Sequence, residues 1–110
     1  MMKKIFLIIA LFAIVAIGVS GCQQQTPMTK ENAIALCREA CQDALSNNLN
    51  LSIGPCLLDP IEGSDYVCDI AHNPREDADN LRENQCNAWH SGEARHFIEF
   101  TPECEFIKAV

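Results

Sequence analysis

The sequence predicts a small α+β domain in which one N-terminal amphipathic helix packs on a three- to four-stranded antiparallel sheet and disulfides staple the two together. Two observations lead to this prediction. Apolar residues recur at helical spacing between residues 30 and 47, and they alternate with polar residues at strand spacing in two later segments. Six of the seven cysteines follow residue 30, and an even number in a short exported chain indicates three disulfides.

The helix is expected from Lys30 to about Asn47. Thr29 is a suitable N-cap, and Glu31 places negative charge near the positive end of the helix. Cys37 and Cys41 lie one turn apart on the apolar side, where helix geometry prevents them from bonding to each other. We therefore expect two separate segments to be tied to this side, which consists of Ile34, Cys37, Cys41, Ala44 and Leu45.

The first strands are expected at Cys56 to Leu58, which is short, and at Tyr66 to His72, where the pattern is clearest. In the second of these, one face of the strand alternates with the other: Tyr66, Cys68 and Ile70 on one, Val67, Asp69 and Ala71 on the other. Cys68 should therefore point toward the helix. Asn73-Pro74 ends the strand.

The last strands are expected to form a β-hairpin, His96 to Thr101 with Glu105 to Val110. Two registers remain open. A three-residue turn pairs Phe100 with Phe106 and places Cys104 where the turn prefers glycine, whereas a two-residue turn shifts the pairing by one.

The segment between these strands, Arg75 to Ala94, is polar and charge-dense, and a short helix is expected from Leu81 to Ser91. Connections of this length in a compact domain are functional or held by a staple, and Cys86 is the expected staple. Trp89 is expected to be a core or loop anchor. Geometry along the chain favours the pairs Cys37–Cys68, Cys41–Cys56 and Cys86–Cys104, with exchanged partners for the two helix cysteines as the main alternative.

An export pattern occupies the first 22 residues. Lys3-Lys4 precede an apolar run from Ile5 to Ile17, and Val19-Ser20-Gly21-Cys22 follows it. These four residues resemble the lipobox of bacterial and some archaeal lipoproteins, with Val19 where that family most often has Leu. The resemblance covers only these first 22 residues and implies a signal peptide at 1–21 and a lipidated Cys22. The polar run after Cys22 is expected to be a tether, at 22–29, and the disulfide-rich domain is expected at 30–110, with the general look of small lipoproteins. The alternative is an uncleaved anchor, since Ile5 to Gly21 is barely long enough to span a bilayer.

The charge argues against nucleic acid as a partner. The formal net charge is −7, and it becomes −9 when Lys3 and Lys4 leave with the signal peptide. An acidic surface repels phosphate backbones and anionic headgroups. We expect the membrane to be reached through lipid at Cys22 alone, on the extracytoplasmic face of the cell envelope, with a protein partner at the cell surface.

Two patterns offer metal ligands. Cys68 with His72 and Cys86 with His90 form a repeated C-x-x-x-H, which is a zinc set in residue type. Within a strand, however, Cys68 and His72 would lie about 13 Å apart at roughly 3.3 Å per residue, too far to share one ion. The acidic loop with Asp77 and Asp79 offers the oxygen ligands that calcium prefers, without the glycine of an EF-hand.

Catalytic motifs are missing from the sequence: it contains no C-x-x-C, H-E-x-x-H, G-x-S-x-G or phosphate-binding glycine loop. We therefore expect no enzymatic activity and no cofactor. The favoured interpretation is a membrane-anchored extracytoplasmic interaction or binding module. The alternative is a zinc- or calcium-binding envelope protein that uses His72, His90, Asp77 or Asp79.

Overall fold

The computed structural model describes residues 27–110, so the expected signal peptide and the lipid attachment at Cys22 lie outside the described residues. Within 27–110, no helix is long and apolar enough to cross a membrane. The chain forms two α-helices, four strands and three short 3₁₀ turns: α1 (Lys30–Ser46), η1 (Leu51–Ile53), β1 (Cys56–Leu58), β2 (Tyr66–Ile70), η2 (Asp77–Asn80), η3 (Arg82–Asn84), α2 (Asn87–Ser91), β3 (His96–Phe100) and β4 (Phe106–Ala109).

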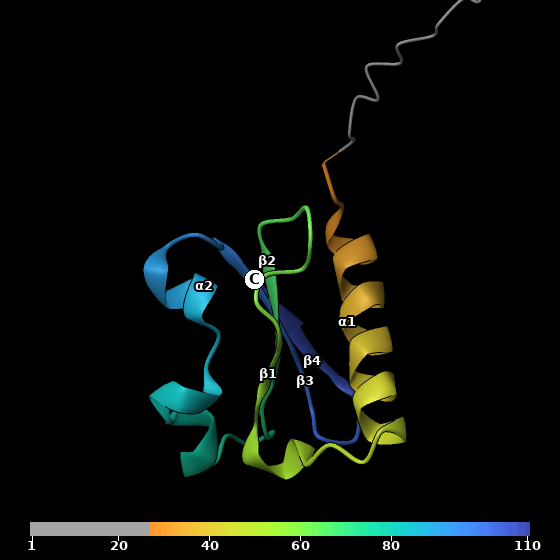
Figure 1. Cartoon of the computed structure of the whole chain (residues 1–110), viewed down its shortest axis with the longest axis vertical. Helices are drawn as coiled ribbons and strands as arrows, with labels where there is room; N and C mark the ends of the chain where they lie inside the picture. The colour runs from red at the N-terminus through yellow and green to blue at the C-terminus, as the bar shows by residue number, and fades with distance from the viewer. Residues whose placement is uncertain (1–26) are drawn as a thin grey trace, which may run out of the picture.

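The four strands form one sheet in the order β1-β2-β3-β4, with α1 on one face and α2 on the other (Figure 1). The α+β class and the four strands agree with the prediction, but the expected purely antiparallel arrangement is wrong. Strands β2 and β3 are parallel, with Tyr66 opposite His96 and Ile70 opposite Phe100. The reason is the long connection after β2, which crosses the face of the sheet and lets the chain enter β3 from the same end.

Helix α1 confirms the predicted span to within a residue. It begins after residue 29, as the first element of the described part rather than at the N-terminus of the chain, and the Thr29 hydroxyl accepts a hydrogen bond from the Asn32 backbone N–H at 3.1 Å. Its buried stripe is narrower than expected, because Leu45 is 44% exposed. Small residues and cysteines fill the stripe instead, which lets the helix approach the sheet closely: Ala33, Cys37, Cys41 and Ala44.

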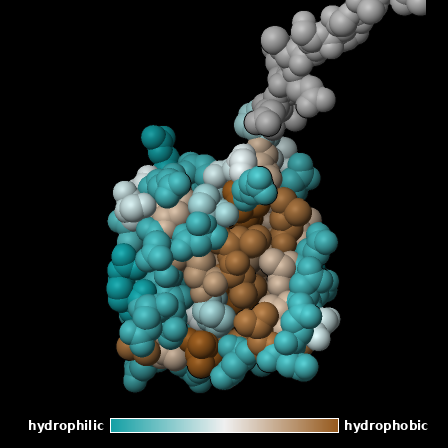
Figure 2. Space-filling model, viewed as in Figure 1, coloured by the Kyte–Doolittle hydropathy of each residue, from teal (hydrophilic) through white to brown (hydrophobic). Residues whose placement is uncertain are grey.

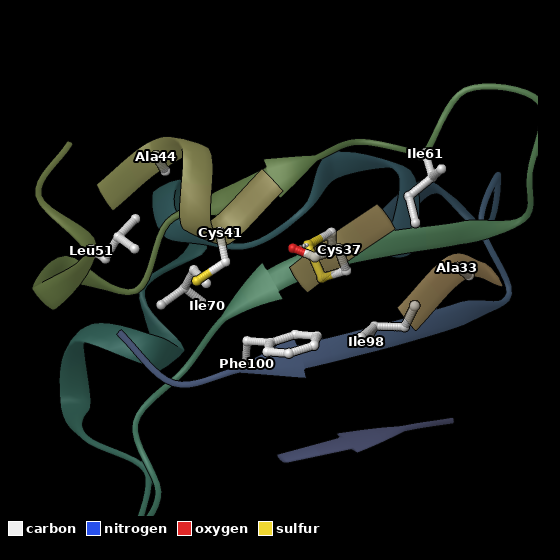
Figure 3. Packing of buried hydrophobic residues seen from close by; sticks show 10 residues of the cluster. Ala33, Cys37, Cys41, Ala44, Leu51, Ile61, Ile70, Ile98 and Phe100 are labelled. Atoms are coloured by element: carbon white, nitrogen blue, oxygen red, sulfur yellow. Dashed lines mark hydrogen bonds between the residues drawn. A yellow bond between two sulfur atoms is a disulfide. The ribbon is translucent and has the colours of Figure 1, made fainter. Parts of the chain in front are cut away.

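The main core lies between α1 and the sheet (Figure 3). Phe100, Ile98 and Ile70 point from the strands toward the helix and are fully buried. This confirms the expected alternation in β2, whose other residues, Val67 and Asp69, point to the opposite face. A smaller cluster on that face joins Val67 to Cys86, Ala88 and Ala94, so both faces of the sheet are covered.

The β3–β4 hairpin uses the three-residue turn. Phe100 lies opposite Phe106, and the Thr101 N–H donates to the Glu105 carbonyl at 2.8 Å. A bulge then shifts the register, so that Ile98 pairs with Ala109. As that register predicts, Cys104 adopts a backbone conformation that glycine prefers, with φ at 66°.

The connection from β2 to β3 differs from the prediction. The expected helix from Leu81 to Ser91 is only α2, preceded by η2 and η3. Leu81 and Cys86 both have extended backbones, which interrupt the helix. Cys86 is extended because its side chain turns in to bond Cys56 on the sheet, and Gly92 ends α2 in the left-handed conformation.

Three disulfides link the layers: Cys37–Cys68, Cys41–Cys104 and Cys56–Cys86. The first confirms the prediction, whereas the expected Cys41–Cys56 and Cys86–Cys104 pairs are wrong. Cys56 lies opposite Asp69 in the antiparallel β1–β2 pair, so its side chain shares the face of Asp69 and points away from α1. It therefore meets Cys86, and Cys41 is left to bond the hairpin turn.

The surface also carries an apolar strip. Figure 2 shows it between β1 and α1, bordered by the polar outer side of the helix. Single exposed apolar residues are ordinary on small domains. A contiguous apolar strip is instead the kind of surface that a binding partner or a membrane covers.

Candidate functional site

The most distinctive polar site is a pocket on the α2 side of the sheet, with a volume of about 130 Å³. We call it the α2-side pocket. Strands β2 and β3 supply its floor, the β2–β3 connection supplies its walls, and β4 contributes Lys108 at the rim. It is lined by Val67, Asp69, Arg75, Gln85, Cys86, Trp89, Phe97, Glu99 and Lys108.

Two acidic side chains lie side by side on the pocket floor. Asp69 on β2 and Glu99 on β3 are register partners in the parallel pair, so their side chains project from the same face. Glu99 is 3% exposed and is paired with Arg75 at 2.7 Å and with Lys108 at 3.5 Å. The two cations therefore neutralise Glu99.

Asp69 has no such partner. Within residues 27–110, its Oδ1 is the one buried side-chain oxygen or nitrogen atom without a hydrogen bond. Burial and, to a smaller extent, the nearby Glu99 carboxylate raise the pKa of Asp69 to about 8, although Arg75 acts in the opposite direction. At neutral pH Asp69 is therefore mainly a carboxylic acid, in contact with the pocket.

Arg75 is fixed in place beside the acids. Its Nη1 donates to Glu99, its Nη2 to the Asp79 carbonyl at 3.2 Å, and both Nε and Nη2 donate to Asn80 Oδ1 at 3.2 Å. The guanidinium is thus largely occupied by protein acceptors. It forms part of the frame of the pocket and leaves few donors for a ligand.

Aromatic rings form one wall. Trp89 on α2 packs edge-to-face on Phe97 of β3, with ring centroids 4.9 Å apart. Trp89 is the predicted loop anchor, yet it remains 40% exposed, which leaves part of its ring open to solvent. Asp59 positions the short helix that carries it, because the Asp59 carboxylate accepts from the backbone N–H groups of Asn87 and Ala88 at 2.8 and 2.7 Å.

Asp79, a candidate calcium ligand, has a structural role. Its carboxylate is 2% exposed and accepts from the backbone N–H groups of Glu76 and His72 and from the His72 ring. Burial raises its pKa, but these hydrogen bonds outweigh burial and hold the pKa of Asp79 below its usual value. Gly54 packs against it so closely that a Cβ would lie 2.5 Å from Oδ1.

The other candidate ligands are dispersed or engaged. His72 bridges Asp79 and Glu76, with Nε2 2.9 Å from the Glu76 carboxylate. His90 contacts the Gln85 side chain. Asp77 is exposed on η2 and is not part of the cluster that His72 forms with Asp79 and Glu76. The structure therefore does not assemble the acidic loop into one set of converging oxygen ligands.

The candidate zinc ligands are not assembled into a site either. Cys68 and Cys86 are in separate disulfides, so neither sulfur is available as a thiolate ligand. Cys56, Asp59 and Cys86 cluster closely enough to resemble a metal site, but here too both sulfurs are oxidised and Asp59 caps α2.

The α2-side pocket was not anticipated from the sequence, although two signals for it exist. Asp69 and Glu99 are acids in mainly apolar strands, and each follows an apolar residue on the same face, Val67 and Phe97 respectively. An acid at such a position is either paired or functional. Chemically, the pocket offers an aromatic wall, a neutral carboxylic acid and a salt-bridged carboxylate, an arrangement suited to binding a small polar group.

Comparison of the chain with protein-family models, with curated proteins and with solved structures finds no match.

Proposed function

We propose that this chain is a membrane-anchored extracytoplasmic binding module and that the α2-side pocket is its recognition site. The occupant is a small molecule or a side chain of a protein partner at the cell surface. The observation that carries the proposal is Asp69, whose buried Oδ1 lies in a pocket without any protein partner.

An acid with a buried, unpartnered oxygen atom is costly to retain. Leaving such a polar group unsatisfied costs about 1–3 kcal/mol, a large part of the stability of a domain of this size. Replacing Asp69 with an apolar residue would remove this cost. The same face of the strand already accommodates an apolar side chain, that of Val67. A ligand that hydrogen-bonds Asp69 supplies the missing partner and accounts for the acid.

The cellular location is supported by chemistry. Disulfides persist in oxidising compartments outside the cytoplasm, and this domain has three. The sequence Val19-Ser20-Gly21-Cys22 supplies the anchor through its resemblance to a lipobox. Replacing Cys22 with Ser should release the domain from the membrane fraction, and continued membrane attachment of Cys22→Ser would favour the uncleaved anchor.

A ligand screen tests the pocket. The oxidised domain is isotope-labelled and titrated with a library of small polar compounds, while the Trp89 indole N–H and the backbone amides of β2 and β3 are followed by NMR. We expect binders to shift these signals and Asp69→Asn or Trp89→Ala to weaken their binding at least tenfold.

Asp43→Asn is the matched control, because Asp43 is an exposed acid on α1, on the other side of the sheet. It should leave binding unchanged. If no compound in a chemically broad library shifts the pocket signals, the pocket is not a recognition site and the proposal is wrong.

The metal-binding alternative finds less support. Its sulfur ligands are in disulfides, and Asp79 is surrounded by donors from its own chain. Titration of the oxidised domain with Zn²⁺ and Ca²⁺, followed by calorimetry, decides between the two: stoichiometric binding would favour the metal-binding function.

A further inference from the structure

In the α2-side pocket, the acidic and the basic side chains lie at different depths. The acids lie on its floor, where Glu99 is 4% exposed at the side chain and the Oδ1 atom of Asp69 is buried. The cations lie at its rim, where the side chains of Arg75 and Lys108 are 43% and 52% exposed. Water screens charges at the rim more strongly than charges on the floor. The charge of an acid on the floor therefore acts on a bound group with less screening than the charge of a cation at the rim.

The rim cations are also already partnered. Arg75 is bound to Glu99, Asp79 and Asn80, and the Lys108 ammonium lies 3.5 Å from Glu99 and 5.4 Å from the Phe97 ring centroid. Asp69 Oδ1 is the unmatched atom, and once the Asp69 carboxyl has lost its proton it can only accept hydrogen bonds. The complementary ligand group is thus a donor.

The aromatic wall favours a donor that carries positive charge. An ammonium group gains energy from the face of a Trp ring as well as from a carboxylate, and the half-exposed ring of Trp89 lines the same cavity as Asp69. The long-range field acts in the same direction, because residues 27–110 hold six Lys and Arg against 15 Asp and Glu.

We propose that the α2-side pocket binds a primary alkylammonium group, whose N–H donates to Asp69 Oδ1 while the ammonium lies against the ring of Trp89. This inference rests on the proposed binding function and names the ligand chemistry. The group can belong to a free amine or to a lysine side chain of a partner protein, since both present the same ammonium on a short alkyl stem.

Binding is coupled to a proton. The charged groups that act on Asp69 are Glu99, Arg75 and, more weakly, Asp79, and Lys108 lines the same cavity. Because burial and Glu99 raise the pKa of Asp69 to about 8, an ammonium that pairs with the carboxylate must displace its proton. The affinity should then rise about tenfold per pH unit below pH 8 and level off above it. A neutral donor would show no such dependence.

The test uses three probes of equal length: n-butylammonium, 1-butanol and butyrate. Each is titrated into the oxidised domain at pH 6, 7, 8 and 9, and the Trp89 indole and β2 amide signals give the dissociation constants. We expect butylammonium to bind at least tenfold more tightly than 1-butanol at pH 8, butyrate to bind more weakly still, and the steep pH dependence to appear for butylammonium alone.

Asp69→Asn should remove the pH dependence and weaken butylammonium binding at least tenfold, whereas Asp43→Asn should change neither. Circular dichroism confirms that both variants are folded. A peptide with one lysine, compared with the same peptide carrying norleucine, then separates the two sources of the ammonium. Tighter or equal binding of 1-butanol or butyrate, or a flat pH profile for butylammonium, would overturn the ammonium assignment.

These outcomes separate the two proposals. If the wider ligand screen finds neutral or anionic binders in the pocket, the binding function stands and the ammonium inference fails. If none of the three probes and no library compound shifts the pocket signals, both fail together.

Discussion

Asp69→Asn should make the stability of the domain less sensitive to pH. The pKa of Asp69 is raised from 3.8 to about 8 by burial and by Glu99. Between these two values the folded state keeps a proton that the unfolded state releases, so the free energy of unfolding of the wild type falls as pH rises. The slope attributable to one such group is at most about 1.4 kcal/mol per pH unit. Asparagine has a similar shape and does not ionise, so it lacks this contribution.

The difference in unfolding free energy, Asp69→Asn minus wild type, should therefore grow with pH and flatten above pH 8. Because Asp69 is only partly buried, we expect a rise of about 2–3 kcal/mol between pH 5 and 7.5 rather than the full value. Guanidinium unfolding at several pH values, with the disulfides intact, measures it, and Asp43→Asn serves as the control. Curves for wild type and Asp69→Asn that stay parallel from pH 5 to 8 would refute the buried-acid interpretation.

Three further variants test the rest of the fold. Phe100→Ala should cost about 3–5 kcal/mol of stability, because Phe100 is fully buried, whereas Phe106→Ala at a 47% exposed position should cost much less; equal melting temperatures for the two variants would show that Phe100 does not have the core position described above. The low pKa of Asp79 means that its carboxylate stabilises the fold above about pH 4 and that this contribution is lost as the pH falls further, so Asp79→Asn should cost about 1–3 kcal/mol at pH 7 and progressively less in acid. Replacing Cys41 and Cys104 with Ala should cost about 2–4 kcal/mol in chemical unfolding, and mapping of unreduced peptides should recover the 41–104 link directly.

Features set by neighbouring residues could be predicted from the sequence. The period of apolar positions located α1, and the alternation along β2 identified the face of Cys68, which was enough to pair it with Cys37. In each case, the information lies within a few residues of the feature.

Features set by the path of the chain could not be predicted in the same way. The parallel β2–β3 pair depends on where the crossover returns, and the partners of Cys41 and Cys56 follow from that path. The pocket depends on it too, since it is the register of the parallel pair that brings Asp69 beside Glu99. Each acid could be noticed as unusual in its strand, but their meeting could not be foreseen.

The left-handed backbone at Cys104 bears on how this domain can be produced in a reducing host. With φ at 66°, any residue other than glycine carries a steric cost of about 1 kcal/mol there. The bond to Cys41 offsets that cost only while it is oxidised. In a reducing cytoplasm the covalent link is lost and the steric cost remains, so the hairpin turn is the segment expected to open first. A cysteine-depleted version for such a host should therefore combine Cys41→Ala with Cys104→Gly, because glycine relieves the strain that alanine would keep.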